Sequence, residues 1–385
     1  MSSAISPRTF SFFIFGATIA LLVLFMHAGP SFPSGSRAFR LPDRLRGVGV
    51  GDGYFAPNTI LPVPSRAYVI SLPRRKDRQE QMERLRTQLG LRWSYVAAED
   101  SASQLVGRIL SQVQSIREEE LKMTERPLNT TIKLPFQWPK SRVPFELMES
   151  EFPTLPPPAP TALDASEPLT CASEDFTLLP YSPSVPEYKI LSATRVACWQ
   201  SHLSVIHRVS AHMPHRHGEA ALVLEDDVDM ERDIRERLLS VWSLLPPDWD
   251  IVFLGHCWSN ESYHPALESS NHTEQTLPSA PPFYLTRLHP SRAPLCTHAY
   301  ALSPTGARRL LFHLTYRPFA YSRAIDHALA WLVKSNRLKS FSVVPSVVVQ
   351  RKILDSDVTE GKGSPWKDGL VKGVLGSGAP DSIPV

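Results

Sequence analysis

The sequence predicts an α/β protein with a largely parallel central sheet, and three observations support that class. Short, continuous apolar runs recur along the chain, as at 67–72, 220–224 and 250–255. Between them lie charged segments in which apolar residues recur at helical spacing. The chain has 385 residues, of which 42% are hydrophobic, and this is enough to bury a sizeable core.

The expected elements alternate in a regular order. The first strand, 67–72, is followed by a helix over 77–89 and a second strand over 93–97. After a proline-rich break the order resumes with a helix over 191–212, a strand over 220–224, a helical stretch over 231–245, strands over 250–255 and 299–302, helices over 303–314 and 324–333, and one or two strands over 341–349. Ser303 and Pro304 predict a helix start, as an N-cap residue and a first-turn proline. Strands that alternate with helices favour a parallel sheet.

Proline marks the segments that fall outside this core. The chain has 36 prolines, about 9% against a usual ~5%. The expected parts are a cytoplasmic tail over 1–9, a transmembrane anchor over 10–26, a flexible stem over 27–65, a folded domain over 66–352 and a disordered tail over 353–385. Within the domain we expect an irregular, proline-rich insertion at 101–188 and a surface loop at 257–296.

The N-terminal apolar segment predicts attachment to a membrane. Residues 10–26 are seventeen uncharged residues, the lower limit for a helix that spans a bilayer. No clear small-residue cleavage site follows, so an uncleaved anchor is favoured over a cleaved signal peptide. The arginines within 37–46 outnumber Arg8, and this balance argues against a lumenal body.

Three glycosylation sequons favour the opposite orientation. They begin at Asn129, Asn260 and Asn271. Together with the apolar segment, they predict a single-pass type II protein of the Golgi or endoplasmic reticulum membrane, with its catalytic domain in the lumen.

Charge and cysteine content exclude several classes. Lys+Arg 41 against Asp+Glu 38 gives a net charge of +3, which excludes a dedicated nucleic-acid binder. The four cysteines include no CxxC pair, so neither a disulfide scaffold nor a structural zinc site is expected. They allow three full pairings. We expect a bridge between Cys257 and Cys296, because both flank the sequon-bearing loop and adjoin expected strands.

The acidic cluster at 225–229 is the most informative motif. It places four carboxylates within five residues, directly after an apolar strand and therefore at the carboxyl end of the sheet, where open α/β sheets bind ligands. Carboxylates this close disfavour one another's ionisation unless a cation is present. Oxygen ligands suit Mn²⁺ or Mg²⁺, which would be held on a diphosphate leaving group. The alternative is a solvated acidic turn that caps the helix after Met230.

Three further features are ambiguous when taken singly. The basic turn at 73–78 could hold phosphates at a strand–helix junction or could be an exposed first turn. His202 lies on an apolar helix stripe, where a satisfied core histidine is the alternative. Asp326 could be a general base or a further ligand, and the alternative is a helix cap. The sequence has no GxSxG, HExxH or GxxxxGK[ST] motif, so serine hydrolases, zincins and P-loop proteins lose their main support.

Six segments in order resemble glycosyltransferase family 25, which includes bacterial lipopolysaccharide-biosynthesis and procollagen galactosyltransferases. They are AYVISLPRRKDRQEQMERLRTQLGL (67–91), ACWQSHLSVIHR (197–208), ALVLEDDV (221–228), DWDIVFLG (248–255), HAYALSPTGARRLL (298–311) and AIDHAL (324–329). The resemblance implies a GT-A-like, Rossmann-type nucleotide-sugar-binding domain with inverting chemistry and, usually, Mn²⁺. Two family positions differ, since Ser71 stands where an asparagine-like residue is usual and Ala197-Cys198 where a Gly-Cys pair is common.

Carried over by position, the resemblance assigns roles to named residues. Asp227 would bind the metal, and we add Asp229 as a second ligand. The nucleotide-sugar donor would bind to the basic turn, the Ser-His pair and the first two residues of the acidic motif. These residues are Arg75, Arg78, Ser201, His202, Glu225 and Asp226. Asp326, in the late acidic block near the acceptor, is the expected catalytic base.

The resulting expectation is a metal-dependent glycosyltransferase that moves a sugar, with galactose favoured, from a UDP-sugar to a hydroxyl of a glycan or protein acceptor. A non-catalytic carbohydrate-binding protein on the same scaffold is the alternative. A metal-dependent phosphohydrolase is disfavoured, because the sequence lacks the second His/Asp ligand cluster of two-metal sites.

Overall fold

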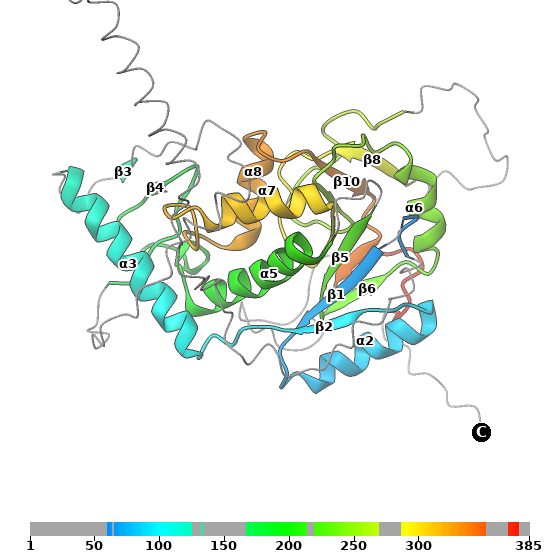
Figure 1. Cartoon of the computed structure of the whole chain (residues 1–385), viewed down its shortest axis with the longest axis horizontal. Helices are drawn as coiled ribbons and strands as arrows, with labels where there is room; N and C mark the ends of the chain where they lie inside the picture. The colour runs from blue at the N-terminus through cyan, green and yellow to red at the C-terminus, as the bar shows by residue number, and fades with distance from the viewer. Residues whose placement is uncertain are drawn as a thin grey trace, which may run out of the picture. The chain divides into compact units, whose positions relative to one another are not determined.

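A mixed seven-stranded sheet forms the centre of the protein (Figure 1). The order of its strands is β2-β1-β5-β9-β7-β10-β8. Its strands are β1 (Ser65–Ser71), β2 (Ser94–Ala97), β5 (Ala220–Glu225), β7 (Ile251–Phe253), β8 (Arg287–Pro290), β9 (Ala299–Leu302) and β10 (Ser340–Val344). The computed structural model describes residues 60–63, 65–124, 132–133, 167–213, 219–268, 286–351 and 369–376. All of them belong to one compact unit, Val50–Val385.

Five of these strands run in the same direction. β1 pairs in parallel with β2 and β5, and β7 pairs in parallel with β10. The two exceptions are β9, which is antiparallel to both β5 and β7, and β8, which is antiparallel to β10. The expected α/β class is confirmed, but the sheet is mixed, because the central strand β9 enters from the opposite end.

Helices cover both faces of the sheet. α2 (Lys76–Leu89) and α6 (Ile234–Trp242) contribute to one core cluster, and α5 (Ala193–His212), α7 (Pro304–Thr315) and α8 (Ile325–Lys334) contribute to another. β5 shows how one strand serves both clusters: Leu222 and Leu224 pack in the first, and Ala221 and Val223 pack in the second. The twofold alternation of side chains along a strand produces this division.

Local sequence signals set several helix ends. The Ser303 side chain accepts a hydrogen bond from the Gly306 N–H at 2.9 Å, and Pro304 occupies the first turn of α7, as predicted. Gly90 ends α2 in the left-handed region, with φ of 60°, where a glycine carries no Cβ penalty.

Smaller elements surround the sheet. β6 (Val228–Met230) pairs antiparallel with β11 (Val348–Gln350), and β3 (Ile132–Lys133) pairs antiparallel with β4 (Thr177–Leu178). A 3₁₀ turn, η2, spans Glu187–Lys189.

The expected insertion at 101–188 contains a long helix, α3 (Gln104–Thr124). Its residues Val106, Ile109 and Val113 are buried in a cluster with Val196 and Ala197 of α5. The stretch 101–124 contains no proline, so the proline-rich character of the insertion begins only after the helix.

The expected surface loop at 257–296 also contributes to the fold. It contains the edge strand β8, and edge strands tolerate the proline at its end. The predicted bridge between Cys257 and Cys296 is present, and Cys171 and Cys198 are not disulfide-bonded. Asn260, the one sequon asparagine among the described residues, is exposed.

Both ends of the folded region extend past the expected limits. Ile60 and Leu61, placed by the sequence in the stem, are buried in the first core cluster. Residues 369–376, placed in the disordered tail, lie against β6, and Val374 is buried.

No helix in the described part of the chain has the length and apolar character needed to cross a membrane. The expected cytoplasmic tail at 1–9, the anchor at 10–26, and the sequons at Asn129 and Asn271 lie outside the described residues.

Candidate functional site

A pocket of about 390 Å³ opens at the edge of the sheet where β1, β2 and β5 end and β9 begins. Its lining includes Ser71 after β1, Glu99 after β2, Glu225 at the end of β5 and Thr297 before β9. This is the edge where open α/β sheets bind ligands.

The acidic motif occupies the middle of this pocket. Glu225 ends β5, and Asp226 and Asp227 form the turn into β6. The Asp226 carboxylate accepts a hydrogen bond from an Arg78 guanidinium nitrogen at 3.0 Å, and the same nitrogen lies 3.6 Å from an Asp227 oxygen. Arg78, placed on α2, is thus shared by two neighbouring carboxylates.

Glu225 has a different set of partners. Its Oε1 atom accepts a hydrogen bond from the Thr297 hydroxyl at 2.8 Å and lies 3.3 Å from Nε2 of His202. Burial acts to raise the pKa of Glu225, but the interactions with His202, His298 and Thr297 together outweigh burial and hold that pKa well below its usual range. Glu225 is therefore the carboxylate that its surroundings keep ionised.

Asp227 is the least compensated of the three acids. Burial raises its pKa, and the negative charge of Glu225 raises it further, against the opposing effect of Arg78. The Gln350 side-chain amide donates to an Asp227 oxygen at 3.2 Å, and the Arg351 backbone N–H donates to the Asp227 carbonyl at 2.8 Å. These contacts fix the position of Asp227 without supplying a full neutralising charge.

His202 and Ser201 join the site from α5. His202 is 1% exposed, and its Nδ1 lies 3.0 Å from the Tyr300 hydroxyl, so the ring is held between that hydroxyl and Glu225. It is both a satisfied core histidine and a direct partner of the acidic motif. The Ser201 hydroxyl accepts from the Glu99 N–H at 2.9 Å and fixes the chain that follows β2 against the pocket.

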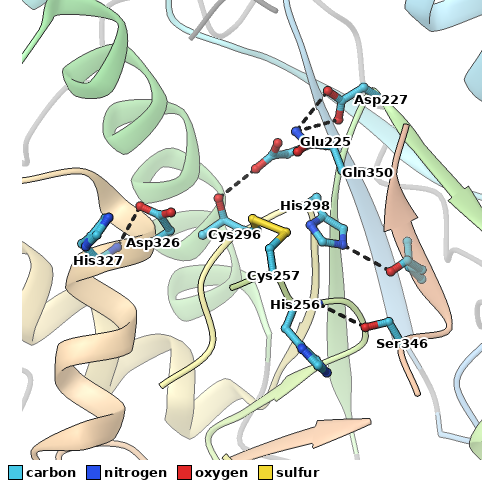
Figure 2. The surroundings of a disulfide bond; sticks show 12 residues. Glu225, Asp227, His256, Cys257, Cys296, His298, Asp326, His327, Ser346 and Gln350 are labelled. Atoms are coloured by element: carbon cyan, nitrogen blue, oxygen red, sulfur yellow. Dashed lines mark hydrogen bonds between the residues drawn. A yellow bond between two sulfur atoms is a disulfide. The ribbon is translucent and has the colours of Figure 1, made fainter. Parts of the chain in front are cut away.

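Asp326 lies on a different wall. It follows the first residue of α8, lines the pocket, and its Oδ1 accepts a hydrogen bond from the His327 N–H at 2.8 Å. Figure 2 shows Glu225 and Asp227 above the disulfide between Cys257 and Cys296, and Asp326 to its left at the start of α8. The structure therefore brings this expected base to the same pocket as the acidic motif.

Two expected site residues lie elsewhere. The Arg75 guanidinium is paired with Asp77 at 3.0 Å, and Arg75 is not part of the pocket lining. Asp229 is buried in β6 and its Oδ1 accepts hydrogen bonds from the backbone N–H groups of Met230, Val374 and Leu375, at 2.8, 3.1 and 3.0 Å. These three donors occupy the carboxylate, so Asp229 is a structural anchor here and is not brought together with Asp227.

The spacing of the possible metal-ligating atoms decides what kind of metal site is compatible with the pocket. Among the described residues, the only three metal-ligating side chains whose ligand atoms all lie within 4.8 Å of one another are Cys257, Cys296 and His298. The two cysteines form a disulfide, so they offer no thiolates. The carboxylates of the acidic motif thus form no closed cage. They fit an ion such as Mn²⁺ or Mg²⁺ that takes one or two carboxylates and completes its shell with substrate phosphates and water.

Sequence reasoning missed two residues that contact the acidic motif. Thr297 donates to Glu225, and Gln350 donates to Asp227. Thr297 adjoins Cys296 and lies just before β9, and this position next to a strand end could have marked it as a site residue. Gln350 had no such signal, because a single glutamine at the end of a short strand carries no pattern.

A comparison of the chain with protein-family models and with curated protein sequences gives no match.

Proposed function

We propose that the protein is a metal-dependent inverting glycosyltransferase of the secretory pathway, attached to the membrane through its N-terminal segment. It would transfer a sugar, with galactose favoured, from a UDP-sugar to a hydroxyl of a glycan or protein acceptor. One observation carries the proposal: Asp227 is an incompletely compensated carboxylate, with a side chain only 9% exposed, in an open pocket at the carboxyl end of β5, beside Arg78.

Each group has a defined part in this reaction. Asp227 would hold the divalent cation, which when bound offsets the negative charge of the leaving diphosphate. Arg78 adds a fixed positive charge beside the same place. Asp326 accepts the proton of the acceptor hydroxyl. As it does so, the hydroxyl oxygen forms a bond to C1 of the sugar, and the bond from C1 to the diphosphate breaks. Attack on the face opposite the leaving group inverts C1.

The test uses the full-length protein. Thermal-shift measurements against a panel of UDP-sugars with Mn²⁺ identify the donor, and release of UDP measures turnover. Asp227→Asn should abolish turnover, because the amide cannot supply the charge that the cation needs. Asp77→Asn is the matched control, since Asp77 is exposed on α2 and outside the pocket, and it should retain activity.

Two results would contradict the proposal. Turnover that needs no metal and survives Asp227→Asn would exclude the mechanism. Binding of a UDP-sugar or a free glycoside without any new product, as followed by mass spectrometry, would favour the carbohydrate-binding alternative.

A further inference from the structure

An exposed tryptophan lies on the wall of the pocket. Trp258 is 69% exposed and lines the same pocket as the acidic motif and Asp326. An aromatic ring exposed at a pocket wall is a feature of binding sites, because it offers an apolar face on which a ligand can pack.

The backbone that carries Trp258 is held through the residue that precedes it. The preceding residue, Cys257, is 2% exposed, forms the disulfide with Cys296, and its N–H donates to the Leu295 carbonyl at 3.0 Å. Trp258 and Cys296 have φ of 51° and 69°, a region that costs a non-glycine residue about 1 kcal/mol and is found at ligand clamps. The indole is therefore attached to a rigid, pre-set segment.

Strand order separates Trp258 from the diphosphate-binding groups. The sheet runs β1, β5, β9, β7 from one side of the pocket to the other. Arg78 and Asp226 lie where β1 and β5 end, whereas Trp258 follows β7, two strands beyond β5. With the donor phosphates at Arg78 and Asp227, the space beside Trp258 is the acceptor side.

Polar groups line the same pocket. They include Asp326 and Thr297, and Figure 2 draws Asp326 to the left of the disulfide. A pocket that combines a flat apolar face with groups able to bind hydroxyls matches a pyranose ring, which has an apolar face of C–H groups and hydroxyls at its edge.

We propose that Trp258 is an acceptor platform, on which the apolar face of one pyranose ring of a glycan acceptor packs. This inference rests on the function proposed above and names the acceptor as a glycan.

The experiment measures sugar binding and nucleotide binding separately. The probes are methyl β-galactoside, methyl β-glucoside and methyl β-N-acetylglucosaminide, titrated by saturation-transfer NMR into the full-length protein with UDP and Mn²⁺, while calorimetry follows UDP alone. The variants are Trp258→Ala, Trp258→Phe and Tyr263→Ala. Tyr263 is the matched control, because its ring is 59% exposed but lies outside the pocket lining.

At least one glycoside should bind the wild type. Trp258→Ala should lower the affinity for that glycoside by at least ~5-fold, whereas the affinities of Trp258→Phe and Tyr263→Ala should stay within ~2-fold of the wild type. The affinity for UDP should be unchanged in all three variants. Thermal unfolding midpoints confirm that each variant is folded.

Three outcomes would overturn the proposed platform. In the first, no glycoside binds although UDP does, and in the second, Trp258→Ala binds glycosides as the wild type does. In the third, Trp258→Ala lowers the affinity for UDP, which would place a nucleobase on the ring. Glycoside binding that depends on Trp258 in a protein that does not bind UDP would retain the sugar site and overturn the transfer function.

Discussion

Three adjacent acids in this pocket have three different environments. Glu225 is kept ionised by His202 and Thr297, Asp226 is paired with Arg78, and Asp227 is left with a raised pKa. Such separation of neighbouring carboxylates is how one short motif can serve several tasks. The sequence showed the cluster, but only the contacts made by residues far along the chain show which acid does what.

Loss of Arg78 should therefore affect both stability and binding. Its side chain and that of Asp226 are 11% and 7% exposed, so Arg78→Met leaves a buried carboxylate without its ion-pair partner. We expect the free energy of unfolding to fall by about 3 kcal/mol and UDP affinity to fall with it. Urea denaturation and calorimetry measure the two effects. Arg92→Met, at an exposed site outside the pocket lining, should change neither, and equal behaviour of the two variants would contradict the assigned role of Arg78.

At the scale of the element, the helices that the sequence predicts are those with an apolar stripe, and most also have a marked start or end. α2, α5 and α7 have both, and Ser303 marks the start of α7 correctly. α6 and α8 have no side-chain cap, and their apolar residues alone predict them. α3 was missed because proline content was averaged over the whole insertion, although the spacing of Val106, Ile109 and Val113 is helical. β8 was missed because a four-residue edge strand within a sequon-bearing loop has no distinguishing period.

α7 also contains a pH-dependent group. His313 is 8% exposed, and its pKa is lowered to about 3, first by burial and then by the charges of Arg337 and Arg309. The unfolded chain, with an ordinary histidine pKa near ~6.5, binds this proton more readily than the folded protein. The stability is therefore complete when the pH is above the pKa of His313 in the unfolded chain. It is lost as the pH falls from there toward the pKa of His313 in the folded protein.

We expect the wild type to lose about 2 kcal/mol more unfolding free energy than His313→Gln between about pH 7.5 and about pH 5. Urea denaturation at both pH values gives this difference, which does not depend on any constant cost of the substitution itself. His212→Gln, at an exposed position of α5, is the control and should follow the wild type. If the stabilities of the wild type and His313→Gln changed with pH in parallel, His313 would not be the group responsible for this pH dependence.

For the molecule as a whole, the segment 369–376 closes the structure in a way that sequence patterns do not show. Two buried carboxylates of the β6 region hold it: Glu231 accepts from the N–H groups of Val371 and Lys372, each at 2.8 Å, and Asp229 accepts from those of Val374 and Leu375. A carboxylate can hold any backbone in this manner, so the segment itself needs no recognisable residues. Asp229 belongs to this anchor, which explains its absence from the pocket.

Truncation tests the anchor directly. A chain that ends at 368 lacks the four backbone N–H groups that this segment donates to Asp229 and Glu231, and it exposes the site of Val374. We expect it to lose about 3 kcal/mol of unfolding free energy. A chain that ends at 376 keeps every described contact and should match the full-length protein. The same denaturation midpoint for both truncated chains would show that the anchor contributes nothing.

The placement of β9 has a consequence for how the protein is made. β5 and β7 are synthesised before β9, yet they are not neighbours in the sheet, since β9 lies between them and pairs with both. A chain that emerges from its N-terminus can assemble β1, β2 and β5 early, but β7 has no place on that sheet until residues 299–302 arrive. Such non-local pairing is slow. We therefore expect the half of the pocket that contains Arg78 and the acidic motif to form first during synthesis, with the Trp258 half joined to it as a late step.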